Sequence, residues 1–326
     1  MKAIVQDRYG APDVLAVREI DQPVPGASDV LVKVRAAAVN ARDWHLMRGD
    51  PYVARLMDKK TFGRHGPNQP VRGTDFAGVV EAVGRGVTTF KPGDAVFGEA
   101  QAAFAEYVCA PQTVVAHLPS ALSFEQAAAF PLAANTALMG LRDLEAGQHL
   151  LVNGASGGVG TFAVQIAKAY GVEVTAVCST RNVALLRELG ADHVIDYTTD
   201  DFTRGQTRYD VLLDLVGNRK LRELRRALKP GGRLVLSGGG VSKGGSLIGP
   251  VGLIVRGKFA ERFVKRHSIS VLDAVPRADN LRTLADLAET GKVVAAIDRE
   301  YPFDQAAEAI RYLEVEHARA KVVLLL

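Results

Sequence analysis

The run from Gly154 to Gly160 (GASGGVG) holds the residues of this 326-residue chain whose types and spacing most directly predict chemistry. It stands between an apolar run typical of a buried strand, 149–153, and apolar residues at helical spacing that begin with Val159. Glycine lets a chain turn tightly and lets a pyrophosphate reach backbone N–H groups at a helix N-terminus, where the helix dipole favours an anion. The spacing is GxxGxxG rather than GxGxxG, so a turn that serves only helix–strand packing is the alternative. The strand–turn–helix–strand context favours dinucleotide binding.

The end of the next expected strand, 172–178, favours one kind of dinucleotide. That strand is followed by Ser179, Thr180 and Arg181, with no acid before Glu188. A site for NAD places Asp or Glu here to bind the ribose 2′-OH, whereas hydroxyls and a guanidinium suit a 2′-phosphate. The alternative is that Arg181 is a solvated residue in the first turn of a helix, although a cation there opposes the helix dipole. The sequence therefore favours NADPH over NADH.

Residues that could ligate a metal show no spacing typical of a metal site. The chain has seven histidines with no i, i+4 pair, and two cysteines, Cys109 and Cys178, with no CxxC. The histidines stand at 45, 65, 117, 149, 193, 267 and 317. We expect no metal site and expect each histidine to be a surface or packing residue. Two cysteines allow at most one disulfide, which suits a reducing cytosol, so a cytoplasmic location is expected.

Two parts of the chain must position these residues. Residues 1 to about 120 have the pattern of short strands joined by Gly and Pro turns, which predicts a compact, mostly β domain. From about 123 to 274 strands alternate with helices, which predicts a doubly wound parallel sheet and an α/β fold class. The strands expected there are 149–153, 172–178, 193–195, 210–216 and 233–237, with a helix marked by Leu221, Leu224 and Leu228 between the last two.

The C-terminal part predicts a helix at 277–290, a strand at 295–301, a helix at 304–316 and a strand at 320–325. Because the last strand is apolar throughout, we expect it to be buried and to return to the sheet of the first domain. The expected domains are therefore 1–122, completed by 275–326, and 123–274.

Composition excludes several classes of protein. With 48% hydrophobic and 23% charged residues the chain is not disordered, and a net charge of +4 makes no case for nucleic acid. The uncharged run 150–167 contains four glycines and several polar residues, so we expect no transmembrane segment. The basic run Arg219–Arg233 is expected to be a solvated helix face. In a second basic run, Arg256–Lys265, the two phenylalanine rings are expected to pack, with a dimer surface or a membrane contact as alternatives.

Longer blocks of the sequence resemble a known family. They are VNGASGGVGTFAVQIAKAYG (152–171), AAAFPLAANTALMGL (127–141), VNARDWHLMRG (39–49), LKPGGRLVLSGGG (228–240), GTDFAGVVEAVG (73–84) and HARAKVVLLL (317–326). Through these blocks the chain resembles the zinc-free medium-chain dehydrogenase/reductase superfamily, in its quinone oxidoreductase branch, over nearly all of its length. The resemblance implies a GroES-like, mostly β substrate domain and a Rossmann domain, with the active site in the cleft between them.

By position, the resemblance implies NADPH contacts along the second domain. The pyrophosphate contacts fall on Ser156, Gly157, Gly158 and Val159, and the 2′-phosphate contacts on Ser179, Arg181 and Tyr197. An ordinary tyrosine at the end of a strand is the alternative for Tyr197. The nicotinamide half is expected to meet Thr136, Val216, Gly217, Ser237, Gly238 and Gly239, most of which follow the carboxyl ends of strands.

The resemblance also concerns the reaction. Zinc-dependent relatives have a catalytic Cys where this chain has Asn40, and a zinc His in the segment that matches Gly73–Asp75. Without that Lewis acid, reduction of an acceptor that is already polarised needs less help than oxidation of an alcohol. We therefore expect NADPH-dependent hydride transfer to a quinone or another conjugated carbonyl. The alternatives are an alkenal or enone reductase and a non-catalytic NADPH-binding regulatory protein. Since relatives are commonly dimers, a homodimer is expected.

The loop from Asn40 to Tyr52 is expected to carry the polar groups that face the substrate. Asn40 could donate a hydrogen bond to the substrate oxygen, and Tyr52 resembles a family tyrosine that lines the pocket. His45 could donate the second proton, with water as an equal alternative, and Asp43 is expected to hold the loop. Many relatives have Gly where this chain has Ala320, which leaves a cofactor contact from the C-terminal part open.

Overall fold

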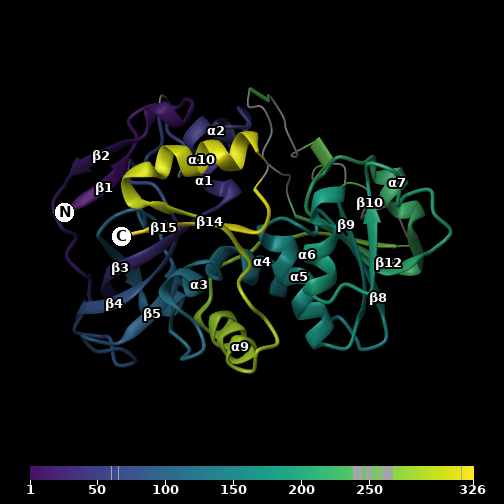
Figure 1. Ribbon diagram of the computed structural model, residues 1–326. Helices are drawn as coiled ribbons and strands as arrows, with labels where there is room; N and C mark the ends of the chain where they lie inside the picture. Colours follow the sequence, from purple (N-terminus) through teal and green to yellow (C-terminus); the bar gives the residue numbers. More distant parts are fainter. Residues whose placement is uncertain are drawn as a thin grey trace. The chain divides into compact units, whose positions relative to one another are not determined.

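Two compact units make up the chain (Figure 1). The computed structural model describes residues 1–59, 61–64, 66–237, 245, 246, 252, 253, 255, 257, 259, 267–316 and 318–326. The first unit holds Met1–Asn135 and Val275–Leu326, with Ser246, and the second holds most of the residues between them.

The first unit is built on a seven-stranded sheet in the order β14-β15-β3-β4-β5-β7, with β6 paired to β3. Its strands are β3 (Asp29–Val39), β4 (Asp75–Val83), β5 (Ala95–Glu99), β6 (Tyr107–Pro111), β7 (Val115–His117), β14 (Ile297–Pro302) and β15 (Lys321–Leu325). A separate hairpin pairs β1 (Lys2–Val5) with β2 (Ala16–Glu19). The helices are α1 (Ala41–Arg48), α2 (Ala54–Met57), α3 (Phe124–Ala128), α9 (Ala278–Glu289) and α10 (Ala306–Val315), with 3₁₀ turns η1 (Pro12–Val14), η2 (Gln112–Val114) and η4 (Phe303–Gln305).

The longest strand of this sheet, β3, shows why the sequence folds this way. Lys33 and Arg35 are exposed, and every other residue from Val30 to Val39 is buried. Both faces of β3 are therefore covered along most of its length, and the two exposed charges interrupt the apolar run.

The C-terminal strand returns to this sheet, as predicted. β15 pairs antiparallel with β3, with Val322 opposite Val39, and parallel with β14 (Figure 1). Its three central residues, 322–324, are buried. The strand order therefore places the C-terminal end of the chain beside residues 36–39 of β3.

The start of the second domain differs from the expected position at residue 123. Helix α3 contacts β3 and β4 and buries Ala127 and Ala128, so it belongs to the first unit. Ser123 begins the helix, because its Oγ accepts a hydrogen bond from Gln126 N at 3.3 Å. The first unit consequently reaches Asn135, inside helix α4 (Pro131–Gly140).

The second unit has a six-stranded sheet in the order β10-β9-β8-β11-β12-β13, and every pair in it is parallel. Its strands are β8 (His149–Asn153), β9 (Glu173–Cys178), β10 (His193–Asp196), β11 (Tyr209–Asp214), β12 (Leu228–Leu236) and β13 (Ser268–Val271). The helices are α5 (Gly158–Ala169), α6 (Val183–Glu188) and α7 (Leu221–Arg226), with the 3₁₀ turn η3 (Thr180–Asn182). The order reverses between β8 and β11, as in a dinucleotide-binding sheet, which confirms the predicted α/β fold class.

Three local predictions need correction. The strand expected to reach Val216 ends at Asp214, because the Asp214 carboxylate accepts the Val216 N–H and turns the chain. Helix α7 ends at Arg226, and Leu228 already pairs with Tyr209 as the first residue of β12. The Phe259 ring, expected to be packed, is 67% exposed, and Phe263 lies outside the described residues.

No helix in the described part of the chain is both long enough and apolar enough to cross a membrane.

Candidate active site

The glycine turn between β8 and α5 contains glycines of two kinds. Gly154 has φ +87°, and a Cβ there would lie 2.7 Å from Val216 Cγ2. A Cβ on Gly160 would lie 2.5 Å from the Ala155 carbonyl oxygen. The fold itself therefore requires these two glycines. Among the described residues, a Cβ on Gly157 would meet only the Gly154 oxygen, at 3.5 Å, so they leave open space at this position.

That open space lies at the N-terminus of helix α5. Gly157 is the N-cap and makes no side-chain cap, and the first turn of the helix contains no acid. The positive end of the helix dipole is therefore not neutralised by a carboxylate of its own first turn. Backbone N–H groups at such an end form a site for an anion such as a pyrophosphate.

Residues expected at a 2′-phosphate lie together at the carboxyl ends of β9 and β10. The Tyr197 N–H donates to the Cys178 carbonyl at 3.0 Å, which ties the two strand ends to each other. Ser179 is half-buried, whereas Arg181 and Tyr197 are exposed, Tyr197 by 54%. The Arg181 and Tyr197 side chains are therefore exposed to solvent at this edge of the sheet.

Two residues near this edge were missed by the sequence analysis. Asn182 is buried, and its Nδ2 donates to Ser156 Oγ at 3.0 Å and to Ser179 Oγ at 3.3 Å, so it links the glycine turn to the end of β9. Asp196 lies opposite Cys178 in the sheet, and hydrogen bonds from Thr180 and Thr198 hold its pKa below the usual range. A carboxylate therefore stands beside the expected phosphate contacts. Only the position of Asp196 at the end of a predicted strand could have pointed to it.

Asp214 organises the carboxyl ends of β11 and β12. Its Oδ1 accepts from Asn153 Nδ2 at 2.8 Å and from the N–H groups of Val216 and Gly217, both at 3.2 Å. Burial raises the pKa of the Asp214 carboxyl, and those hydrogen bonds oppose the rise. Its carbonyl accepts the Ser237 N–H at 3.0 Å. The expected nicotinamide contacts Val216, Gly217 and Ser237 thus surround one buried carboxyl.

Three of the five remaining expected cofactor residues lie in the described part of the chain. Thr136 lies in α4 and is 7% exposed. Gly158 and Val159 begin helix α5 and are half-buried. Gly238 and Gly239 lie outside the described residues.

In the first unit, strand register brings a buried lysine to Asn40 and Asp75. Lys321 precedes Val322, which pairs with Val39, and Asp75 pairs with Ala38. Lys321 Nζ donates to Asn40 Oδ1 at 2.5 Å and lies 3.7 Å from Asp75 Oδ2. Burial lowers the pKa of Lys321 and raises that of Asp75, and the attraction between the two charges opposes both shifts.

Two further acids in this region hold protons more tightly than usual. Burial raises the pKa of Asp43 to about 7, although the Asn40 N–H donates to its Oδ2 at 2.8 Å. Burial and the neighbouring Asp75 raise the pKa of Glu99 to about 8, although Arg42 Nη1 lies 3.1 Å from its Oε1. The first unit therefore buries a cluster of acids around one ammonium.

The three residues expected to face the substrate lie in different surroundings. Asn40 is 5% exposed, its Oδ1 accepts from Lys321, and its Nδ2 donates to the Ala38 carbonyl at 3.3 Å. His45 is half-buried, and its Nδ1 lies 2.9 Å from the Asp50 carbonyl oxygen. Tyr52 is 42% exposed, and its ring centre lies 4.7 Å from the Arg55 guanidinium carbon. The three side chains therefore have different contact partners.

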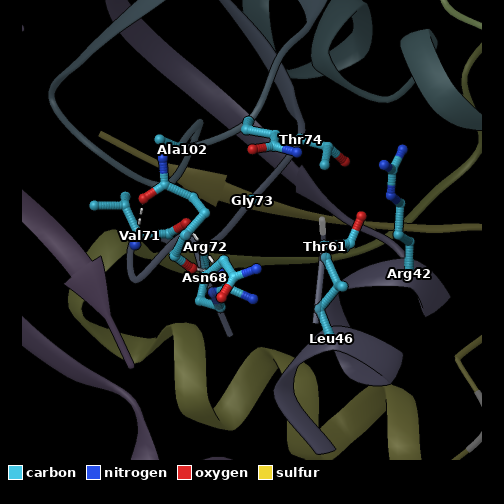
Figure 2. Close-up of a pocket in the computed structure, with 11 residues that line it drawn as sticks. Arg42, Leu46, Thr61, Asn68, Val71, Arg72, Gly73, Thr74 and Ala102 are labelled. Carbon is cyan, nitrogen blue, oxygen red and sulfur yellow. Dashed lines mark hydrogen bonds between the residues drawn. The ribbon is translucent and has the colours of Figure 1, made fainter. Parts of the chain in front are cut away.

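Two polar cavities lie in the first unit. One, of about 250 Å³, is lined by Arg42 and Arg72 and contains none of the three expected catalytic residues; Figure 2 shows its lining. The other, of about 360 Å³, is lined by Tyr52 with Tyr9, Gly10, Arg48, Arg55, Arg64 and Gly245. Tyr52 is therefore the one expected catalytic residue that reaches either of the two cavities.

Three potential metal ligands lie close together although their spacing along the sequence is not typical of a metal site. In the second unit, ligand atoms of His149, Glu173 and His193 all lie within 4.8 Å of one another. The strands that carry them are neighbours in the sheet, and sequence spacing does not show such neighbours.

Two family models match this chain. One, described as an alcohol dehydrogenase GroES-like domain, matches residues 26–120, and the other, described as a zinc-binding dehydrogenase, matches residues 189–324.

Curated relatives match over almost the whole chain. A chloroplastic NADPH-dependent alkenal/one oxidoreductase of Arabidopsis thaliana is 34% identical over 99% of this chain and 79% of its own length. A chloroplastic quinone oxidoreductase of Triphysaria versicolor is 31% identical over 99% of this chain and 98% of its own length.

Solved structures share the fold. The quinone oxidoreductase from Coxiella burnetii has a TM-score of 0.85 and 31% identity, covering 100% of this chain and 99% of its own. The Escherichia coli quinone oxidoreductase complexed with NADPH has a TM-score of 0.82 and 25% identity, covering 100% of both chains.

Proposed function

This chain belongs to the medium-chain dehydrogenase/reductase family, in its quinone oxidoreductase branch, and we propose that it is an enzyme that uses NADPH to reduce a quinone or another conjugated carbonyl. Relatives with both kinds of name support this substrate class, one a quinone oxidoreductase and one an alkenal/one oxidoreductase.

The observation that carries the proposal is the open space at Gly157. Gly154 and Gly160 are explained by backbone conformation and close packing, but no contact with the described residues requires Gly157. A side chain there would project at the N-terminus of α5, where an anion is favoured. A ligand that approaches the backbone closely, such as a dinucleotide pyrophosphate, accounts for the absence of that side chain.

The second unit would hold NADPH with residues from four successive strand ends. The turn after β8 would bind the pyrophosphate, Ser179, Arg181 and Tyr197 the 2′-phosphate, and the Asp214 turn the nicotinamide half. When bound, NADPH supplies the hydride. Asn182 would orient the two serine hydroxyls at the phosphate end, and Asp214 would fix the turn formed by Val216 and Gly217.

The buried ammonium of the first unit favours a reaction without zinc. Asn40 stands where the resemblance matches one zinc ligand of relatives, and Asp75 belongs to the segment that matches another; both side chains pair with Lys321. A positive charge already faces these oxygens, so a metal cation would be repelled there. In this arrangement Asn40 positions the loop rather than donating to substrate, which leaves His45 and Tyr52 as the candidate polar groups near substrate.

Gly157→Val tests the cofactor site. The valine side chain should weaken NADPH binding by at least about 100-fold, or about 2.7 kcal/mol, because it fills the space of the pyrophosphate. Calorimetric titration with NADPH measures this, and far-UV circular dichroism checks the fold. Gly205→Val is the matched control, since Gly205 is an exposed glycine of the same unit and, in the described part of the chain, a Cβ there would meet only the Phe202 oxygen, at 4.0 Å.

Two results would contradict the proposal in different ways. Unchanged NADPH affinity in the folded Gly157→Val variant would remove the turn from the cofactor site. NADPH binding by the natural chain without oxidation by any member of a quinone and enone panel would instead identify a non-catalytic NADPH-binding protein.

We also propose that the protein is located in the cytoplasm and that it forms a homodimer. Both cysteines are free thiols in the structure, which suits a reducing compartment. Because some relatives are chloroplastic or mitochondrial, fractionation of cells is the measurement for location, and sedimentation velocity is the measurement for the dimer.

A further inference from the structure

Three potential metal ligands lie together at the amino-terminal edge of the sheet in the second unit. His149 is the first residue of β8, Glu173 of β9 and His193 of β10. One ligand atom from each lies within 4.8 Å of the other two. We infer that this cluster is a binding site for a divalent transition metal, with Zn²⁺ as the expected ion.

The backbone brings the three side chains to one face of the sheet. Parallel pairing puts His149 opposite Glu173 and puts His193 opposite Thr175. Glu173 and Thr175 are two residues apart on one strand, so they point to the same face. All four side chains therefore share that face, and three adjacent strands fix their spacing.

The side chains need little movement to enclose an ion. His193 Nε2 lies 2.8 Å from Glu173 Oε1, and these side chains are 58% and 50% exposed. Donors in a tetrahedral zinc site with bonds of about 2.0–2.1 Å lie about 3.3 Å apart. Rotation of the exposed Glu173 and His193 side chains can supply that spacing without a change in the backbone. Their exposure also leaves the fourth position to water.

The surroundings of the cluster suit a cation. His149 is half-buried beside the Glu173 carboxylate, which attracts a cation. The other charged groups near it are Lys229 and Asp210, which pair with each other at 2.8 Å. Thr175 Oγ1 lies 2.8 Å from His149 Nε2, and such a neighbour holds a ligand ring in place.

The donor set selects the class of metal. Two imidazoles and one carboxylate suit Zn²⁺, Cu²⁺ and Ni²⁺, whereas Mg²⁺ and Ca²⁺ prefer oxygen ligands. The cluster starts the three strands whose opposite ends carry the glycine turn, Ser179 and Tyr197. A metal here would therefore tie β8, β9 and β10 together without touching the proposed cofactor residues.

Titration with ZnCl₂ tests the site. The experiment uses a tag-free chain with Cys109→Ser, since Cys109 is a partly exposed thiol that could also bind zinc. One equivalent of Zn²⁺ should bind, and His193→Ala and Glu173→Gln should each weaken binding by about 10-fold or more. His117→Ala, which changes an exposed histidine of the first unit, should bind as tightly as the parent.

Thermal unfolding gives a second measurement. Zn²⁺ should raise the melting temperature of the parent chain but not that of His193→Ala, because a ligand of the folded state stabilises it. His193 is exposed, so its replacement should leave the fold intact, and NADPH affinity should be unchanged. If the parent fails to bind Zn²⁺, or if both variants bind it as tightly as the parent does, the cluster is only a surface ion pair and the inference is overturned.

Discussion

At the scale of single residues, Arg181 is expected to decide between the two forms of the cofactor. It is exposed at the start of η3, one turn beyond the end of β9. Arg181→Glu should raise the KM for NADPH by about 10- to 100-fold, because a charge-assisted hydrogen bond to phosphate is replaced by repulsion. The KM for NADH should change little. Steady-state kinetics with both cofactors and one fixed quinone measures the two effects.

Arg187→Glu is the control for this prediction. Arg187 carries the same charge on the exposed side of α6, one element further along the chain. If both variants raise the KM for NADPH equally, the effect belongs to net charge rather than to a phosphate contact at Arg181. Equal changes for NADPH and NADH in Arg181→Glu would also remove Arg181 from the 2′-phosphate site.

At the scale of the elements, the residue that precedes β15 has a strained backbone. Ala320 has φ +56° and is 7% exposed. The left-handed conformation costs Ala about 1–2 kcal/mol. Relief of that cost in Ala320→Gly should offset the lost methyl burial and the added freedom of the unfolded chain. The unfolding free energy should therefore change by less than about 0.5 kcal/mol.

Ala309→Gly supplies the comparison. Ala309 is likewise a buried residue of the first unit, but it lies inside helix α10, where Gly is unfavourable. That change should cost about 2 kcal/mol, from helix propensity and the buried methyl together. Urea unfolding of both variants measures the difference. An equal loss in Ala320→Gly would show that the positive φ of Ala320 carries no strain.

Elements could be predicted from the sequence because their signals are local. The apolar runs 30–39 and 149–153 and the helical spacing after Val159 lie in short windows, and the structure has β3, β8 and α5 there. Element ends were less predictable. Asp214 ends β11 through hydrogen bonds of its side chain, and α3 belongs to the first unit through packing that no local window contains.

Contacts between distant residues account for what the sequence could not show of the candidate site. Lys321 meets Asn40 across 281 positions of the chain through antiparallel pairing of β15 with β3. His149, Glu173 and His193 meet through the registers of two parallel pairs. Strand order and register determine which side chains meet in the Lys321 cluster and in the histidine cluster. The spacing of residues along one strand or helix carries no information about these contacts.

At the scale of the whole molecule, the buried acids predict how stability depends on pH. Asp43 and Glu99 have pKa values of about 7 and about 8 in the folded chain, above their ordinary values of 3.8 and 4.5. Between the ordinary and the raised pKa of each group, the folded chain keeps a proton that the unfolded chain releases. Their contribution to stability is therefore complete below about pH 4 and is lost as the pH rises through about 7 and 8. Each group can contribute at most about 1.4 kcal/mol per pH unit.

Glu99→Gln isolates this effect from other groups that titrate in the same range. The lowered pKa of His149 acts in the opposite direction below its ordinary value of 6.5, so the comparison between variants is more direct than the total slope. Glutamine keeps an oxygen for Arg42 but does not titrate. The unfolding free energy of the natural chain should thus fall more steeply than that of Glu99→Gln between pH 5 and pH 8.

Urea unfolding at several pH values measures the two slopes, with Glu188→Gln as the control. Glu188 is exposed at the end of α6, so its replacement should leave the slope of the natural chain unchanged. Parallel slopes for the natural chain and Glu99→Gln would mean that Glu99 is ionised in the folded chain throughout this range. The Arg42 guanidinium would then outweigh the burial of Glu99, and the cluster around Lys321 would hold its charges at neutral pH.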